Sequence, residues 1–364
     1  MITLCSKDSL NIKSSGKINL PEKVITKREI NQVLQTALYN ASIPHDYEMI
    51  HVIPKIFMID NTQIINPLNT NANSLEVQVN VIVVKKNLIA NLRNVFTRLN
   101  LNNLSFVLNS YSTIFALTDL IQRKNGCAIV NIGAETSELI CIKDNSFIYN
   151  SFLPVGSRNI TNDLALMLNI PIDVAENIKY KYGNLLKDYK NLDHSQNILR
   201  IEHSNETLNL SNIQTIVHAR VEETLILLRK KLKDSASINE LNSGILITGG
   251  LANLKGVKEL AQRVFEGIPI FLAAPTNLQN RFINLEDYLL SSTVGALNYI
   301  INQDNRYELD SNKKLLSLIN DEVKHKEIVK LDRQENKDDL KLTPLEKESG
   351  AKINTIYKKL LEWF

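Results

Sequence analysis

Two glycine-containing turns in this chain have the composition of phosphate-binding loops. In VNIGAET a β-branched run leads into Gly133 and, three residues later, Thr136. In GILITGG a buried run is closed by Gly249 and Gly250 before a helical stretch. Glycine allows backbone N–H groups to approach an anion closely. An ordinary hairpin glycine is the more common explanation for the first turn, whereas the second divides evenly between ligand contact and tight packing.

Charged side chains and cysteines offer little chemistry of their own. Glu176 and Lys179, in AENIKYKYG, are three residues apart and share one face of a predicted helix. Such spacing is more typical of a solvated ion pair than of a ligand site. Cys5, Cys127 and Cys141 show no CxxC spacing and have no His cluster nearby. We therefore predict no catalytic residue, no metal ligand and no disulfide framework.

The composition suits a protein of two or three domains in a reducing compartment. At 364 residues the chain is long enough for substantial apolar cores. Its 42 Lys and Arg against 39 Asp and Glu give a net charge of +3, which excludes the strong basic field of a nucleic-acid binder. No apolar run reaches the roughly 18 residues of a membrane span, and MITLCSKDSL lacks a signal-peptide pattern. We expect a cytosolic protein that is neither exported nor integral to a membrane.

The first third of the chain predicts a small α+β unit followed by helices. MITLCSKDSLNIKSSGKINL has the pattern of short extended segments, and Thr26 with Glu29 forms a capping box that opens a helix in REINQVLQTALYN. EMIHVIPKIFMID and LEVQVNVIVV predict strands, and the density of β-branched residues in the second predicts a central one. Helices are expected over 88–99 and 112–120.

The middle of the chain predicts a β-meander and then an α/β arrangement. GCAIVNIGAETSELICIKDNSFIYNSFLPVGSRNIT contains three strands joined by turns. Helices are expected over 162–168, over 174–182 and, with the strongest amphipathic pattern, over about 213–232. GILITGG predicts a buried strand, followed by a helix in LKGVKELAQRVF, a strand in IPIFLAAP and a last helix in SSTVGALNYI. Charges of both signs dominate 304–350, which predicts a solvated linker.

Taken in this order, the elements resemble the FtsA family of bacterial cell-division proteins, within the actin and Hsp70 ATPase superfamily. The matching segments are HVIPKIFMIDNTQIINPLN, the second phosphate motif in AIVNIGAETSELICI, VGSRNITNDLALMLNIPIDVAENIKYKYG, the adenosine motif in GILITGGLANLKGVKELAQRVF, and the closing helix SSTVGALNYI. The resemblance implies an α/β, actin-like (ribonuclease H-like) two-lobed fold, N-terminally incomplete, with a small inserted α+β subdomain and a C-terminal amphipathic helix.

The resemblance also implies a division of the chain and a nucleotide site. It implies a family-specific subdomain over 1–85, a first-lobe remnant over 86–125 with its closing helix at 291–302, a second-lobe core over 126–169 and 240–290, a small second-lobe subdomain over 170–239, a linker over 303–350 and a membrane-targeting helix over 351–364. ATP with Mg is expected between the lobes. The nucleotide-binding positions implied are Gly133, Thr136, Gly156, Glu176, Lys179, Gly249 and Gly250.

Two departures from the family pattern bear on catalysis. The chain starts beyond the family's first phosphate motif, an Asp-x-Gly-Thr/Ser hairpin, for which we expect a truncated open reading frame rather than a true loss. In the second motif the family's Asp is Asn131, and its two later glycines are Ala134 and Glu135. Asn brings no charge for Mg²⁺ and cannot act as a general base, and Glu135 would repel a phosphate unless it turns away. We expect weak or absent ATPase activity.

The last fourteen residues, AKINTIYKKLLEWF, predict a membrane-surface helix. One continuous stripe of that helix holds Ile353, Ile356, Tyr357, Leu360, Leu361 and Phe364, with Trp363 and Lys359 beside it. An aromatic tip and flanking lysines suit the interface of an anionic bilayer. The alternative is a helix docked on the protein itself. We favour the membrane, because the long charged segment makes docking optional and the family has a terminal targeting helix.

Further expectations follow from the resemblance alone. It implies a structural adaptor that tethers FtsZ filaments to the cytoplasmic face of the inner membrane at the division site and helps to recruit later division proteins. Arg220 matches a family arginine implicated in binding the FtsZ C-terminal tail, and a solvated helix charge beside Glu222 or Glu223 explains it equally well. Actin-like self-association is expected as well.

Two other readings stay open at this point. The first is an actin-like type IV pilus assembly protein resembling PilM, which would lack the terminal membrane helix and bind a pilus-protein peptide. The second is an active phosphotransferase of the sugar-kinase type. That activity needs an intact first phosphate motif and a catalytic Asp near a substrate hydroxyl, and neither is visible in the sequence.

Overall fold

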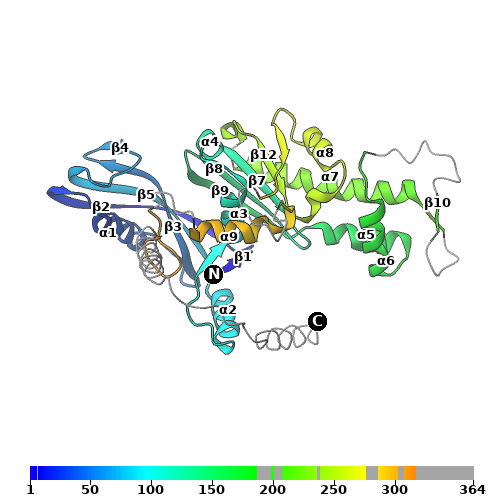
Figure 1. Ribbon diagram of the computed structural model, residues 1–364, viewed down its shortest axis with the longest axis horizontal. Coiled ribbons are helices and arrows are strands. Elements are labelled where there is room, and N and C mark those ends of the chain that lie inside the picture. Colours follow the sequence, from blue (N-terminus) through cyan, green and yellow to red (C-terminus); the bar gives the residue numbers. More distant parts are fainter. Residues whose placement is uncertain are drawn as a thin grey trace, which may run out of the picture. The chain divides into compact units, whose positions relative to one another are not determined.

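The computed structural model describes residues 1–5, 7–186, 198–200, 207–235, 238–275, 286–301 and 307–316 (Figure 1). Within these ranges the strands form one sheet of four, one sheet of five and two small pairs. No helix of these ranges has the length and apolar character to cross a membrane. The predicted terminal helix over 351–364 and most of the predicted linker lie outside the described residues.

The N-terminal subdomain is a four-stranded antiparallel sheet covered by one helix. The strands run in the order β2 (Leu10–Val24), β5 (Asn71–Lys85), β3 (Tyr47–Ile59) and β4 (Thr62–Ile64). Strand β5 pairs on both sides, as the β-branched run in LEVQVNVIVV predicts. Helix α1 (Lys27–Tyr39) begins at the predicted Thr26–Glu29 capping box. It packs closely on β2 because Gly16 lacks a side chain: a Cβ there would lie 2.5 Å from the Val33 carbonyl oxygen.

The second sheet combines the predicted meander with two parallel strands. β7 (Cys127–Ile132), β8 (Ser137–Lys143) and β9 (Ser146–Leu153) pair antiparallel, and β12 (Ile245–Thr248) and β13 (Ile270–Leu272) add in parallel, giving the order β13–β12–β7–β8–β9. Both faces are buried. Ala128 and Val130 of β7 belong to one core and Cys127 and Ile129 to another. This is the sheet expected of one lobe of the actin-like, ribonuclease H-like fold.

Helices on one face of this sheet complete the first of those cores. They are α5 (Ser157–Leu168), α6 (Ile172–Tyr182), α7 (Leu210–Asp234) and α8 (Val257–Val264), with a short strand pair, β10 (Ile198–Arg200) and β11 (Thr207–Asn209), before α7. All four helices fall where helical spacing was predicted, although α5 begins earlier, directly after Gly156. Their apolar faces pack together around Ile213, Val221, Leu225 and Leu260.

The other face of the sheet is covered by α3 (Asn109–Leu117) and α9 (Ser291–Ile301). These two helices approach closely at Gly295, where a Cβ would lie 2.1 Å from the Ser112 carbonyl oxygen. The same core includes a parallel pair of short strands, β1 (Ile2–Leu4) and β6 (Phe106–Leu108). Helices α2 (Lys86–Arg98) and α4 (Leu120–Asn125) complete this part. Helix α4 was not predicted, and its sequence signal is the Asp119–Gln122 capping box.

Residues 307–316, here called the strap, correct the expectation of a solvated linker that starts at residue 303. The backbone groups of Leu309 and Val52 exchange two hydrogen bonds of 3.1 Å, so the strap pairs with β3. The Tyr111 hydroxyl donates to Glu308 at 2.6 Å, and the Ser311 hydroxyl accepts from the Phe106 N–H at 2.8 Å. Seven strap residues are buried: Tyr307, Glu308, Leu309, Asp310, Ser311, Leu315 and Leu316. The charge-rich composition of the whole 304–350 segment conceals this short apolar stretch.

Candidate functional site

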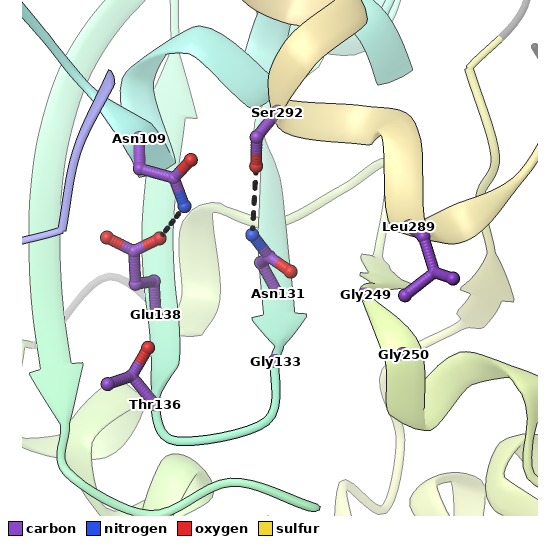
Figure 2. Close-up of a pocket in the computed structure, with 9 residues that line it drawn as sticks. All are labelled: Asn109, Asn131, Gly133, Thr136, Glu138, Gly249, Gly250, Leu289 and Ser292. Carbon is purple, nitrogen blue, oxygen red and sulfur yellow. Dashed lines mark hydrogen bonds between the residues drawn. The ribbon is translucent and has the colours of Figure 1, made fainter. Parts of the chain in front are cut away.

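A cavity of about 200 Å³ opens where the β7–β8 hairpin, the end of β12 and the first turns of α3 and α9 meet (Figure 2). The residues that line it are Asn109, Asn131, Gly133, Thr136, Glu138, Gly249, Gly250, Leu289 and Ser292. Strands β7 and β12 are parallel neighbours, and Thr248 lies opposite Asn131 in their register. Both strands therefore end at the same edge of the sheet, the edge at which ligands bind in α/β folds.

Gly249 shapes one wall of the cavity. Its φ angle is +86°, and a Cβ would lie 2.5 Å from both the Asn131 Oδ1 and the Ile132 carbonyl oxygen. A side chain at this position would be strained and would also collide with β7. The turn into the short helical segment Gly250–Asn253 therefore requires glycine, and it brings the backbone of β12 directly against the β7 end.

The hairpin turn forms the opposite wall and is braced by α5. The Gly133 N–H donates to the Thr136 carbonyl oxygen at 2.9 Å, which closes the turn. The N–H groups of Ser157 and Arg158 donate to the carbonyl oxygens of Gly133 and Ala134 at 2.9 and 2.8 Å. The first free N–H groups of α5 are thus satisfied by the hairpin rather than directed at a ligand. Two backbone hydrogen bonds therefore join the hairpin directly to the start of α5.

The predicted nucleotide-binding positions divide into two sets. Gly133, Thr136, Gly249 and Gly250 line the cavity, whereas Gly156, Glu176 and Lys179 do not. At Gly156 a Cβ would lie 2.3 Å from the Ala134 carbonyl oxygen, so glycine is needed here for packing against the hairpin. Four of the seven positions thus lie at one edge of the sheet, and the other three lie at or in the helices α5 and α6 beside it.

Glu176 and Lys179 form more than the solvated ion pair that their spacing suggests. The Lys179 Nζ lies 2.7 Å from the Glu176 Oε2, and it also donates to the Thr161 hydroxyl at 2.8 Å. Thr161 in turn donates to Glu176. Partial burial works to raise the pKa of Glu176, but the hydrogen bonds from Lys179 and Thr161 prevail and lower it. The trio joins α5 to α6 beside the hairpin.

Four lining residues were not singled out by the sequence pattern, namely Asn109, Glu138, Leu289 and Ser292, and Glu138 is the ionisable one among them. It lies in β8 directly opposite Asn131 in the antiparallel register, is 4% exposed and accepts a hydrogen bond from the Asn109 amide (Figure 2). Burial raises the pKa of Glu138 to about 7, although hydrogen bonds from Asn109, the Cys5 thiol and the Ser110 backbone act in the opposite direction. The sequence did contain a signal for Glu138, because its carboxylate stands inside the apolar run SELICI. A strand that is buried on both faces tolerates a charged side chain only where that charge has a partner.

Glu135, at the tip of the hairpin, does not line the cavity. Its carboxylate lies 2.7 Å from the Arg158 Nε, and both side chains are more than half exposed. This ion pair directs the Glu135 charge to the surface, so the repulsion expected between Glu135 and a bound phosphate is avoided. Asn131 instead donates from its amide to the Ser292 hydroxyl at 3.4 Å, which connects the hairpin to α9.

Arg220 has two acidic partners on α5 and α7. Its Nη2 lies 2.9 Å from the Asp163 Oδ1, and its Nη1 lies 2.6 Å from the Glu223 Oε2. The bidentate pair with Asp163 raises the already high pKa of Arg220 and fixes α7 against α5. The remaining predicted site residues, which form the membrane-binding set from Ile353 to Phe364, lie outside the described residues. No group of three metal-ligating Cys, His, Asp or Glu residues occurs in the described ranges.

Two family models match the chain. The model described as "Cell division protein FtsA" covers residues 128–294, and the model described as "SHS2 domain inserted in FTSA" covers residues 10–83. The second range contains the whole four-stranded sheet with α1 except the last strand residues. A curated relative, the cell division protein FtsA of Helicobacter pylori, is 34% identical over 305 residues, which are 82% of this chain and 62% of the relative. The chain thus spans less than two thirds of the length of that relative.

Solved structures show more distant similarity. The PilM–PilN type IV pilus biogenesis complex matches with a TM-score of 0.47 and 16% identity, over 78% of this chain and 75% of the solved one. MreB5 of Spiroplasma citri bound to ADP matches with a TM-score of 0.46 and 16% identity, over 60% and 68%. The family models confirm the predicted α/β, actin-like fold with its inserted small subdomain. With the relative in Helicobacter pylori, they show that the chain belongs to the FtsA family of bacterial cell-division proteins.

Proposed function

We propose that this chain is a division adaptor that tethers FtsZ filaments to the cytoplasmic face of the inner membrane and helps to recruit later division proteins. The observation that carries the proposal is the combination of FtsA-family membership with the terminal stripe from Ile353 to Phe364. A single aromatic-tipped amphipathic helix after a charged segment is what a peripheral anchor requires. Catalysis is secondary to this role.

The terminal helix provides reversible rather than permanent attachment. Partial burial of five or six large apolar side chains in a bilayer contributes on the order of 5 to 10 kcal/mol before ordering costs. Each lysine near an anionic surface adds about 1 kcal/mol. A helix of fourteen residues is marginal in water, so it folds as it binds and part of this free energy is lost to ordering.

The cavity at the β7–β8 hairpin is the proposed nucleotide site, with ATP as the ligand. Its support is the convergence of the two glycine turns, around Gly133 and Gly249, at one edge of the five-stranded sheet. The donors that line the cavity are carboxylate, amide and hydroxyl oxygens, which fit Mg²⁺. When bound, Mg²⁺ would neutralise phosphate charge. We propose weak or absent turnover, because position 131 carries an amide in place of an acid.

The proposed FtsZ-tail contact at Arg220 involves a preorganised cluster rather than an isolated cation. Asp163 and Glu223 hold the guanidinium in place on α7. Arg220 therefore presents only part of its hydrogen-bonding capacity to a partner. Self-association through the actin-like body is proposed on family grounds alone.

The proposal is tested by the emission of Trp363, which is the only tryptophan in the chain. We expect a blue shift when vesicles containing anionic lipid are added, and we expect salt to weaken it. Leu360→Glu places a charge on the apolar stripe and should abolish the shift. Thr355→Asn, on the opposite face, is the matched control and should preserve it. Emission that is blue in buffer alone and insensitive to vesicles would mean that the helix docks on the protein, which contradicts the tether.

A further inference from the structure

Glu138 is the single ionisable side chain among the nine residues that line the cavity. The other eight are neutral: Asn109, Asn131, Gly133, Thr136, Gly249, Gly250, Leu289 and Ser292. No lysine or arginine belongs to this lining, although a site for a polyphosphate needs positive charge from some source. Among these nine described residues the only charge is that of one carboxylate, and a negative charge favours a cation over an anion.

Among the residues that the structure describes, the groups that donate hydrogen bonds to Glu138 bring it no positive charge. Its hydrogen-bond donors are the Asn109 amide, the Cys5 thiol and the Ser110 backbone N–H, all of which are neutral. The carboxylate is almost completely buried. An ionised carboxylate in such a place is costly unless a cation reaches it. A structural role explains this arrangement poorly, because an amide or an apolar residue would fill the same space without that cost.

Glu138 lies where its carboxylate can supply the negative charge that residue 131 lacks. Asn131 and Glu138 are direct cross-strand partners in the β7–β8 ladder. Such partners project on the same face of a sheet with Cβ atoms about 4.5–5.5 Å apart. The charge that Asn131 does not supply is therefore present one strand away, on the same wall of the cavity (Figure 2).

The neighbouring donors select the kind of cation. Besides Glu138, the wall carries the amide oxygens of Asn109 and Asn131 and the hydroxyls of Thr136 and Ser292. Oxygen-only sets of this type suit Mg²⁺, Mn²⁺ or Ca²⁺ rather than thiolate- or imidazole-seeking metals. We propose that Glu138 is the carboxylate through which this pocket holds a divalent cation beside a nucleotide phosphate, in place of an acid at position 131. This inference rests on the proposed nucleotide site, and it adds the residue that makes binding cation-dependent.

Two measurements on the full chain test the proposal, with Glu138→Gln as the isosteric variant. Mn²⁺ alone, followed by electron paramagnetic resonance, should bind the wild type and should bind E138Q on the order of 10- to 100-fold more weakly. Calorimetric titration with ADP should show tighter binding with Mg²⁺ than with EDTA in the wild type. In E138Q this enhancement should be lost, while ADP affinity in EDTA is unchanged or increased because a repulsive charge is gone.

Glu135→Gln is the matched control, because it removes a carboxylate from the same hairpin outside the cavity. It should leave both measurements unchanged. Asn131→Asp adds a second acid to the wall and should tighten Mn²⁺ binding, which keeps the test valid if E138Q folds poorly. Equal Mn²⁺ binding by E138Q and the wild type, or an intact Mg²⁺ enhancement in E138Q, would overturn the proposal. A wild type that binds Mn²⁺ but no ADP would contradict the nucleotide site while supporting the cation ligand.

Discussion

At the scale of single residues, Glu138 shows that a site residue can work against the stability of its own fold. Burial raises the pKa of the Glu138 carboxyl from 4.5 to about 7, so the folded state binds this proton more tightly than the unfolded state does. The associated stability is fully present below pH 4.5 and is lost as the pH rises through about 7. A difference of this size corresponds to about 3 kcal/mol.

The replacement Glu138→Gln should therefore stabilise the metal-free protein in a pH-dependent way. At pH 8 the free energy of unfolding should rise by up to about 3 kcal/mol, because the variant no longer buries a charge. At pH 4.5 the difference should be close to zero, since the wild-type carboxyl is then protonated in the folded state. Urea denaturation in EDTA at the two pH values measures this. An equal gain in E138Q at both pH values would contradict the assignment to ionisation.

At the scale of elements, the sequence predicted those whose signals are local. The Thr26–Glu29 box begins α1, the β-branched run makes β5 central, and the meander β7–β8–β9 follows its turns. The predicted phosphate turns also meet at one cavity. The cavity's acid and its α3 and α9 residues escaped prediction, because Asn109, Glu138 and Ser292 come together only through the tertiary packing of distant segments.

The strap escaped prediction for a related reason. Its apolar positions are few, and their burial depends on partners more than 190 residues away, such as Tyr111 for Glu308. Nothing within residues 307–316 themselves identifies β3 as the neighbour of Leu309. Local composition therefore indicates a solvated linker, whereas long-range contacts place Tyr307, Leu309 and Leu315 in the core of the N-terminal subdomain and Leu316 in the core that includes α3 and α9.

The strap should be an essential part of the folded body. A chain that ends at residue 316 should retain the thermal stability of the full chain, whereas one that ends at residue 306 should lose at least about 4 kcal/mol, because Leu309 and Leu315 no longer fill their sites. Hydrogen exchange provides a local measurement. The amide of Val52, which donates to Leu309, should lose protection in the shorter chain. Equal melting temperatures and equal protection in the two chains would show that the strap is dispensable.

At the scale of the whole molecule, the proposed tether must act collectively. One predicted terminal helix would bind a bilayer only modestly, because the free energy of apolar burial is reduced by the cost of folding fourteen residues at the surface. Subunits aligned on one filament bind as a group, since each bound helix holds its neighbours near the membrane at a high effective concentration. Because the affinity of a single helix for the bilayer is modest, a subunit outside a filament would exchange readily between the membrane and solution.

This collective behaviour predicts that FtsZ polymers control membrane binding. At protein concentrations where the chain alone barely binds anionic vesicles, polymers of FtsZ with an intact C-terminal tail should raise vesicle binding by about 10²- to 10⁴-fold. Flotation of vesicles measures the bound fraction. Tail-less FtsZ polymers are the control and should have no effect, because they offer no attachment point. Leu360→Glu should abolish binding even with intact polymers, since an array of defective helices gains nothing from its number. If intact and tail-less polymers recruited the chain equally, attachment would not pass through the tail, and the adaptor would have to engage the filament by another surface.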